Sequence, residues 1–242
     1  KISKEINLDA FQDYLALGYI PFDSSIYEGI NKLPAAHTLL VEELKLNRSK
    51  YWQVSIEKKI ICEEDAILGV SETIETAIND QTVSDVPVGL YLSGGIDSST
   101  VSAVAAKKLD YKVRSFTIGF DETWNDERKY AKSVSEGINL DFHEETLSYE
   151  KTSQMFAAFV QAYDEPFFGG SAFPCLFISE LTQKIGNKVI LAGDGGDELF
   201  AGYLRYDTYS ENVHKEHKTS NKDPVESYFR IPTVGIAQPE DI

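Results

Sequence analysis

Two short glycine-rich segments limit the folds open to this chain more than any other feature. Residues 93–99 read Ser-Gly-Gly-Ile-Asp-Ser-Ser, and residues 193–198 read Gly-Asp-Gly-Gly-Asp-Glu. Each segment follows an apolar run typical of a buried strand and precedes a helical pattern. Because parallel strands bring their carboxyl ends to the same edge of a sheet, we expect the two loops to lie close together at that edge.

The chain around these loops alternates strand and helix patterns. Strands are expected at residues 86–92, 113–120, 140–143 and 188–192, and helices at 63–80, 101–109, 126–136, 149–162 and 173–185. Residues 1–60 are irregular, with a short helix that ends at Gly18 and strand candidates at 38–41 and 51–54. The alternation predicts an α/β fold with a parallel sheet covered on both faces.

The first loop has the chemistry of a phosphate cradle. Gly94 and Gly95 permit close approach of the backbone, the serine hydroxyls can donate to phosphate oxygens, and the next helix directs its first N–H groups at the anion. An ordinary P-loop needs a lysine, which this segment lacks. Asp97 would repel phosphate unless a divalent cation lay between them, which favours a Mg²⁺ ligand. The alternative is a helix-capping turn in which Asp97 or Ser98 satisfies free N–H groups.

The second loop adds a further carboxylate at the same edge. If the two loops converge, Asp97 and Asp197 could jointly hold one Mg²⁺ against a pyrophosphate. Taken alone, the loop could equally be a Ca²⁺-binding turn or a plain helix start, although it lacks the EF-hand spacing.

Together these motifs resemble the synthetase domain of the asparagine synthetase family, one of the PP-loop ATP pyrophosphatases. The resemblance rests on SGGIDSS and AGDGGDELFAGY, and on matching segments at residues 85–89, 115–120, 126–127 and 164–166. It implies an adenine nucleotide alpha hydrolase-like domain at residues 61–242, truncated at its C-terminus. Residues 14–21 and 30–37 resemble the tail of the family's N-terminal-nucleophile glutaminase domain, so residues 1–60 are expected to be a remnant of it.

The resemblance also implies roles for individual residues. Phosphates and nucleotide would be held by Tyr91, Leu92, Ser93, Gly94, Gly95, Asp97, Ser98, Ser99, Ile118 and Gly193, with Tyr91 and Ile118 offering backbone groups. Asp97 and Asp197 would bind Mg²⁺. Asp194 stands where an acidic residue is implicated in forming the acyl-adenylate, and some members have the longer Glu there. Glu165 could border the substrate pocket.

The implied reaction is ATP-dependent amide synthesis through an acyl-AMP, from aspartate and glutamine-derived ammonia to asparagine, AMP and pyrophosphate. Two alternatives stay open: amidation of a different carboxylate, and a nucleotide-binding module without catalysis. Some asparagine synthetases carry an arginine in the segment after Tyr163, where this chain has Phe-Phe-Gly-Gly at residues 167–170. The family's N-terminal cysteine nucleophile and its C-terminal helical portion, with a catalytic lysine, are expected to be missing, so the fragment alone is expected to be poorly active.

The composition of the chain excludes some classes of binding partner. A formal net charge of −16 opposes binding to nucleic acid or to an anionic membrane. The longest apolar run is too short for a membrane helix, and there is no signal core, so a cytoplasmic location is expected, with a homodimer possible for the full-length protein. The two cysteines, Cys62 and Cys175, are expected to be buried free thiols. His143 is expected to be a hydrogen-bonded structural histidine.

Overall fold

The computed structural model describes residues 3–55, 61–121, 126–204 and 206–207, which form two compact units. The first unit contains the described residues of Lys1–Ile60 with Gln161–Gly169 and Asp207, and the second contains those of Ile61–Val160 and Gly170–Tyr206. No helix in the described ranges is both long and apolar enough to span a membrane.

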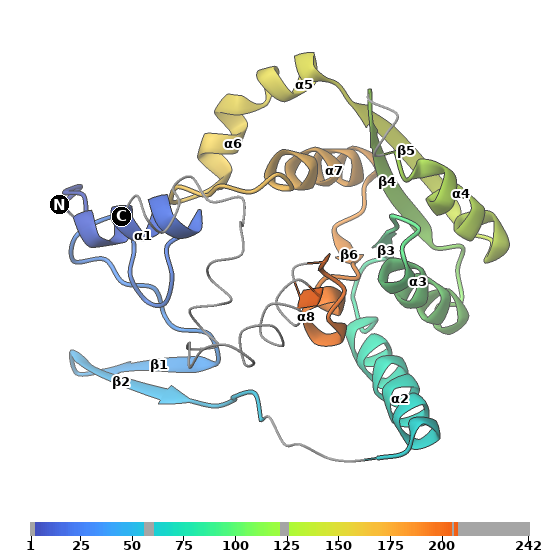
Figure 1. Ribbon diagram of the computed structural model, residues 1–242, viewed down its shortest axis with the longest axis horizontal. Coiled ribbons are helices and arrows are strands. Elements are labelled where there is room, and N and C mark those ends of the chain that lie inside the picture. The colour runs from blue at the N-terminus through green and yellow to red at the C-terminus, as the bar shows by residue number, and fades with distance from the viewer. Residues whose placement is uncertain (1–2, 56–60, 122–125, 205, 208–242) are drawn as a thin grey trace, which may run out of the picture. The chain divides into compact units, whose positions relative to one another are not determined.

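The second unit is built on a four-stranded parallel sheet with the order β5-β4-β3-β6 (Figure 1). The strands are β3 (Val88–Tyr91), β4 (Arg114–Phe120), β5 (Asp141–Leu147) and β6 (Val189–Leu191). The helices are α2 (Glu63–Gln81), α3 (Ile96–Lys108), α4 (Arg128–Gly137), α5 (Tyr149–Gln154), α6 (Phe156–Ala162), α7 (Ala172–Ile185) and α8 (Gly196–Phe200). The α/β class with a parallel sheet is therefore confirmed.

The order of the strands creates a reversal next to β3. The chain runs outward from β3 through β4 to β5, and then returns to the other side of β3 to form β6. Right-handed crossovers require helices of the outward and returning paths to lie on opposite faces, and α4 and α7 do so (Figure 1). The reversal point between β3 and β6 is where open α/β sheets bind their ligands.

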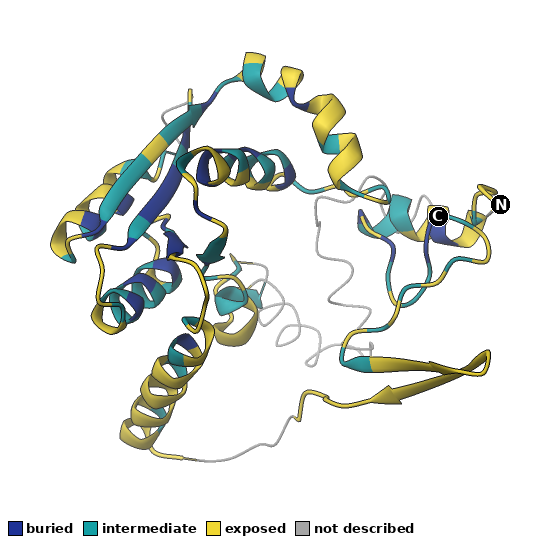
Figure 2. Ribbon diagram, turned by 180° about the vertical axis from the view of Figure 1, so that it is seen from behind, coloured by how far each residue is buried: buried dark blue, intermediate teal, exposed yellow. Residues whose placement is uncertain are grey.

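The core of this unit is centred on β3 and β4, whose residues are largely buried (Figure 2). Leu90 and Phe116 are fully buried, as expected for strands covered on both faces. Leu90 packs in one cluster with Ala105 of α3 and Ala131 of α4. By contrast, most of α2 is exposed among the described residues, and only Ile78 is buried.

Several expected boundaries are corrected. The helix expected at 149–162 is two helices, α5 and α6, because the chain breaks at Met155, which is buried against Leu147 and Phe177. Strand β5 extends past the expected residue 143 to Leu147, because it pairs with β4 along its whole length. Its polar Glu144 and Glu145 hide that extent from a hydrophobicity pattern.

Among its described residues, the first unit contains helix α1 (Leu8–Leu17), the last two residues of α6, and an antiparallel hairpin of β1 (His37–Glu42) and β2 (Lys45–Lys50). The Asn7 side chain caps α1 at its start, and Gly18 ends it in the left-handed conformation. The strand expected at 51–54 is wrong. Glu43 and Leu44 both have positive φ and form a two-residue turn whose twist suits a hairpin, so the second strand begins at Lys45.

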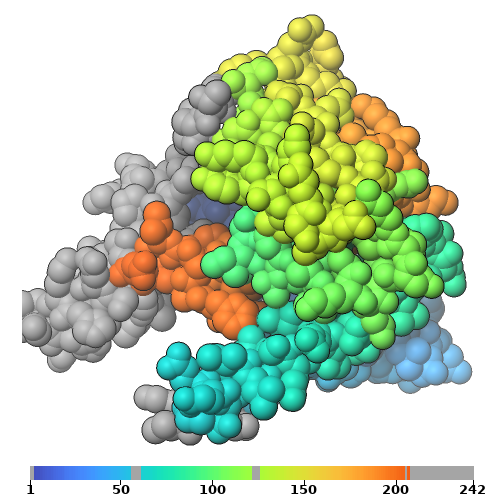
Figure 3. All heavy atoms as spheres, turned by 90° about the vertical axis from the view of Figure 1, so that its right-hand side faces the viewer, coloured from blue at the N-terminus to red at the C-terminus, as the bar shows by residue number. Residues whose placement is uncertain are grey.

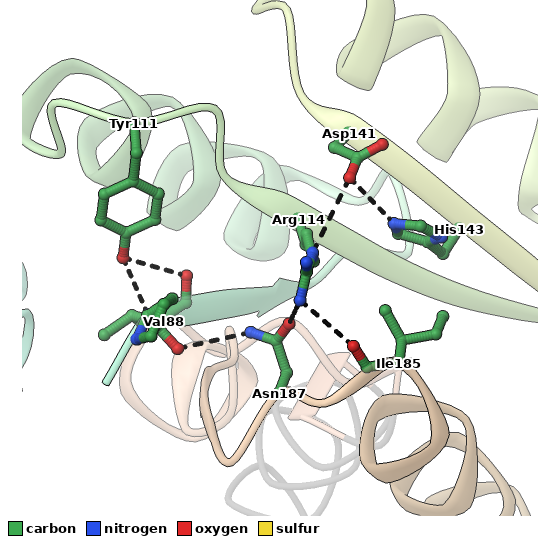
Figure 4. Close-up of polar contacts among 8 residues, drawn as sticks. Val88, Tyr111, Arg114, Asp141, His143, Ile185 and Asn187 are labelled. Carbon is green, nitrogen blue, oxygen red and sulfur yellow. Dashed lines mark hydrogen bonds and ion pairs between the residues drawn. The ribbon is translucent and has the colours of Figure 1, made fainter. Parts of the chain in front are cut away.

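A polar network ties the strands together at their amino ends, the edge opposite the glycine-rich loops (Figure 4). Arg114 Nη1 donates to Ile185 O at 3.2 Å and to Asn187 Oδ1 at 3.0 Å, while its Nε lies 3.8 Å from Asp141. The same Asp141 carboxylate lies 3.1 Å from Nε2 of His143, whose ring stacks on Phe116. The expectation of a structural, hydrogen-bonded His143 is confirmed.

Two buried serines on neighbouring helices give a matched test of core polarity. Ser102 on α3 is fully buried, and its hydroxyl has no hydrogen-bond partner in the described part of the chain, whereas the Ser135 hydroxyl on α4 lies 3.4 Å from that of Ser115. We expect Ser102→Ala to raise the free energy of unfolding by about 1 kcal/mol, since no hydrogen bond is lost. Ser135→Ala should give a free energy of unfolding about 1 kcal/mol lower than Ser102→Ala does, because it leaves the buried Ser115 hydroxyl without its hydrogen-bond partner. Urea unfolding compares them, and equal effects would contradict this view.

Candidate active site

The two glycine-rich loops leave adjacent parallel strands at the same edge of the sheet. Strand β3 pairs with β6 through Leu90 and Leu191, so the loops that follow the two strands leave the sheet at neighbouring positions. The Leu92 N–H still donates to Phe116 O at 3.0 Å, and the chain then departs from β4. The predicted common position of the loops is confirmed.

The first loop is held by its own serines. The hydroxyls of Ser93 and Ser98 lie 2.9 Å apart, and the Ser98 hydroxyl also accepts from the Ser93 N–H at 3.3 Å. The N-cap of α3 is Gly95, which makes no side-chain cap. The Ser98 hydroxyl therefore serves the loop rather than capping the helix. Ser99 takes no part in this bonding, because its buried hydroxyl has no partner among the described residues.

Gly94 brings this loop into direct contact with α4. Its φ is +88°, and a Cβ placed there would lie 2.5 Å from Ala131 N and 2.6 Å from Tyr130 C. Both neighbours are backbone atoms, which cannot move aside as a flexible side chain could. The loop therefore requires glycine at this position both for its dihedral angle and for its packing.

The second loop packs against the first through its own glycines. A Cβ on Gly193 would lie 2.7 Å from Ser98 N, and one on Gly196 would lie 2.5 Å from Asp97 Cγ. The Asp97 carboxylate is half-buried and lies against Gly196, immediately before Asp197. The carboxylate of the first loop thus contacts the backbone of the second loop.

The other predicted metal ligand points to a different neighbour. The Asp197 carboxylate lies against Gly202, whose N–H donates to Asp197 O at 3.0 Å. Within the described ranges, no group of three or more His, Cys, Asp or Glu side chains gathers as a metal site. Two carboxylates suit Mg²⁺ bound partly by phosphate and water, because this ion keeps several waters and takes few protein ligands.

Helix α7 contributes polar groups beside the ends of β3 and β6. The Tyr91 hydroxyl lies 3.3 Å from that of Ser179, which donates to Cys175 O at 2.7 Å. Partial desolvation and the negative charge of Asp194 both raise the pKa of the Cys175 thiol, although the residue as a whole is exposed, and the effect of Asp194 places this carboxylate near α7. Both cysteines are free, as expected, but exposed rather than buried, because Cys62 precedes α2 and Cys175 lies on an open side of α7.

Ile118 lies two residues beyond the last pair between β3 and β4, Tyr91 with Phe116. Alternate residues of a strand direct their backbone groups to the same side, so Ile118 directs its own toward the space past the end of β3. That position is compatible with its predicted backbone contact to a nucleotide.

A separate pocket of about 200 Å³ opens at the carboxyl ends of β4 and β5. It is lined by Phe120, Asp121, Leu147, Tyr149, Thr152, Gly170, Phe173 and Pro174. None of the predicted site residues lines it, so the converging loops, and not this pocket, define the candidate site.

A family model described as asparagine synthase matches residues 69–234, more than half of the chain. The chain belongs to the asparagine synthase family. It is 35% identical over 206 residues to a Methanocaldococcus jannaschii protein named "Putative asparagine synthetase 2" (glutamine-hydrolysing), covering 84% of this chain and 40% of that protein. It is 29% identical over 204 residues to asparagine synthetase 1 of Bacillus subtilis, covering 84% of this chain and 32% of that protein.

The matched relatives are longer than this chain, and not all of them are named asparagine synthetases. An amidase of Penicillium rubens is 28% identical over 211 residues, covering 78% of this chain and 31% of the amidase. The chain thus spans 40% or less of the length of these curated relatives. Among solved structures, the glutamine-dependent NAD+ synthetase of Acinetobacter baumannii aligns with a TM-score of 0.41 and 16% identity, over 69% of this chain and 31% of that one.

Proposed function

We propose that this chain is the ATP-binding core of a ligase that activates aspartate as an acyl-adenylate and passes it to ammonia to form asparagine. The observation that carries the proposal is the contact between the two loops, in which Gly193 and Gly196 pack on Ser98 and Asp97 at the reversal point of the sheet. Membership of the asparagine synthase family supports the same reaction class.

The first loop would hold the phosphates of ATP. The N–H groups at the start of α3 have no side-chain cap and lie where the loop opens, so they can donate to an anion. The Ser93–Ser98 hydroxyl pair keeps the loop in shape and can offer a further donor. Tyr91, Leu92, Ile118 and Gly193 would line the nucleotide with backbone groups.

Asp97 and Asp197 would hold Mg²⁺ at the junction of the loops. When bound, the ion would offset the charge that develops on the leaving pyrophosphate. Asp97 is suited to the role because its carboxylate lies between the two loops. Asp197 would have to turn from Gly202 toward the phosphates to join it.

The reaction would proceed in two displacements. An oxygen of the substrate carboxylate attacks the α-phosphorus, the bond from that phosphorus to the bridging oxygen breaks, and pyrophosphate leaves. Ammonia then attacks the acyl carbon, the bond to the AMP oxygen breaks, and the nitrogen loses a proton to solvent. Positioning and electrostatics dominate such steps, so backbone donors and carboxylates suffice without a protein nucleophile. Asp194 would lie beside the reacting carboxylate.

The wider organisation is part of the same proposal. Residues 1–60 would be the tail of a glutaminase domain that supplies ammonia, and residues 61–242 the synthetase domain. The division of the chain at Ile60 and Ile61 supports this boundary, although Gln161–Gly169 also belongs to the first unit. The full-length protein would act on small molecules in the cytoplasm, and a homodimer is compatible with it.

One feature of the chain favours a second candidate, amidation of another carboxylate. Residues 167–170 are Phe-Phe-Gly-Gly, where some asparagine synthetases carry an arginine that could pair with a substrate carboxylate. Phe167 and Phe168 are partly exposed. The absence of an arginine from this segment of the sequence favours an acid other than aspartate.

ATP–pyrophosphate exchange by the full-length protein, with a panel of carboxylic acids, separates these possibilities. Exchange stimulated by aspartate alone would support asparagine synthesis, and exchange stimulated by a different acid would identify the second candidate. If Mg·ATP raises the melting temperature while no acid stimulates exchange, the chain is a nucleotide-binding module. If Mg·ATP gives no stabilisation, the ATP-binding core itself is disproved.

A further inference from the structure

Arg128, the first residue of α4, makes side-chain hydrogen bonds to two segments of the second unit. Its Nε donates to both Asp126 oxygens at 2.9 and 3.1 Å, and its Nη2 donates to Asp126 Oδ2 at 2.6 Å. Its Nη1 donates to the Thr146 hydroxyl on β5 at 2.7 Å. The guanidinium therefore links the residues before α4 to the carboxyl end of β5.

The path of this side chain crosses β4 at Gly119. Gly119 is paired with Thr146 in the sheet, and a Cβ on Gly119 would overlap the Nε and Cζ atoms of Arg128. The absent side chain leaves the space that the guanidinium fills. The Arg128 side chain is thus bound by three residues, Gly119, Asp126 and Thr146.

The start of α4 is also fixed by the same pair of residues. The N-cap Glu127 makes no side-chain cap, and instead Asp126 Oδ1 accepts from the Arg128 N–H at 3.0 Å. Hydrogen bonding to Arg128 lowers the pKa of Asp126 to about 2, and the same contact raises the pKa of Arg128. The pair is therefore fully charged at neutral pH, which makes its hydrogen bonds the stronger, charge-assisted kind.

The first turn of α4 is the surface on which the phosphate loop rests. Gly94 approaches Tyr130 and Ala131 at their backbone atoms, and the Ala131 N–H is bonded to Glu127 O at 3.1 Å. A shift of α4 by a few tenths of an ångström would move the wall that defines the position of Gly94. In Figures 1 and 3 α4 lies beside α3, whose N-terminus follows the same loop.

We propose that Arg128 is a positioning residue for the phosphate loop: it fixes the first turn of α4 on β4 and β5, and that turn fixes Gly94. The effect on ATP rests on the proposed function, but the effect on the loop does not. Arg128 itself is held by Asp126 and Thr146, so it acts through α4 and not by contact with phosphate.

The test compares Arg128→Gln and Thr146→Val with Arg114→Gln in the full-length protein. Arg114 makes a comparable network with the same strands, but at their opposite ends. Without nucleotide, we expect amide hydrogen exchange in residues 92–99 to be about tenfold faster in Arg128→Gln, the effect of losing a charge-assisted hydrogen bond, and less accelerated in Thr146→Val. Arg114→Gln should leave that segment near the wild-type rate. The Kd for Mg·ATP should rise about tenfold in Arg128→Gln, less in Thr146→Val, and not in Arg114→Gln.

Two results would overturn the positioning role: unchanged exchange in residues 92–99 of Arg128→Gln, or equal acceleration in Arg114→Gln, which would indicate general destabilisation. If the exchange pattern is as expected but the wild-type protein does not bind Mg·ATP, Arg128 still positions the loop and the proposed function fails instead.

Discussion

Gly94→Ala is expected to lower the free energy of unfolding by about 3 kcal/mol or more and to abolish measurable binding of Mg·ATP. Alanine at φ +88° is strained by about 1–2 kcal/mol. Its Cβ would also lie 2.5 Å from Ala131 N, and forcing extra volume against packed backbone costs about 1–3 kcal/mol. Relief of the clash requires the loop to leave α4, which displaces its phosphate donors. Urea unfolding and a thermal-shift titration with Mg·ATP measure the two effects.

The neighbouring glycine provides the matched control for stability. Gly95 has an ordinary φ of −70°, and a Cβ there would meet only the Ser93 hydroxyl at 3.4 Å. Gly95→Ala should therefore change the free energy of unfolding by no more than about 1 kcal/mol. A loss of stability in Gly95→Ala as large as that in Gly94→Ala would show that the contact with α4 is not what demands glycine.

Asp97→Asn and Asp197→Asn are each expected to reduce kcat/KM for ATP–pyrophosphate exchange by about 10²–10³-fold. An amide of the same size keeps the packing of Asp97 against Gly196 but removes the charge that would hold Mg²⁺ between the loops. Since both carboxylates would bind the same ion, kcat/KM of the double variant should be little lower than that of the less active single variant. Raising the Mg²⁺ concentration should partly restore each single variant.

Glu136→Gln is the control for loss of charge alone, because Glu136 is exposed near the end of α4. It should leave exchange unchanged, and all these variants should unfold at nearly the wild-type urea concentration. Near-normal exchange in Asp197→Asn would remove Asp197 from the metal site, in agreement with its contact to Gly202. Near-normal exchange in Asp97→Asn would contradict the metal site as a whole.

The local part of this structure could be predicted from the sequence because its signals are local. The apolar run that ends at Tyr91, the glycine pair and the following helical spacing all lie within one strand–loop–helix unit, and the structure has that unit with β3 and α3. The same is true of β6 and the loop that starts at Ala192. Patterns failed where a strand consists largely of polar residues, as in the fully exposed strand β2 and in the second half of β5.

Long-range contacts in the site had no such signal. Cys175 and Ser179 belong to the middle of α7, and nothing near them in the sequence shows that they come close to Asp194 and Tyr91. Arg128 begins a helix in which an exposed arginine is ordinary. Its bond to Thr146, 18 residues along the chain, depends on the pairing of β5 with β4.

By itself, the sequence determined the two buried strands that precede the glycine-rich loops, which loops carry glycine and carboxylate, and that both loops follow parallel strands. Those properties depend on burial and backbone freedom at each residue, which nearby residues largely decide. Only the tertiary structure decided that β6 lies beside β3, that Gly196 packs on Asp97, and that Gly94 rests on α4. Strand order and close backbone approach arise from packing between segments far apart in the chain, and periodicity within one segment carries no information about its neighbour.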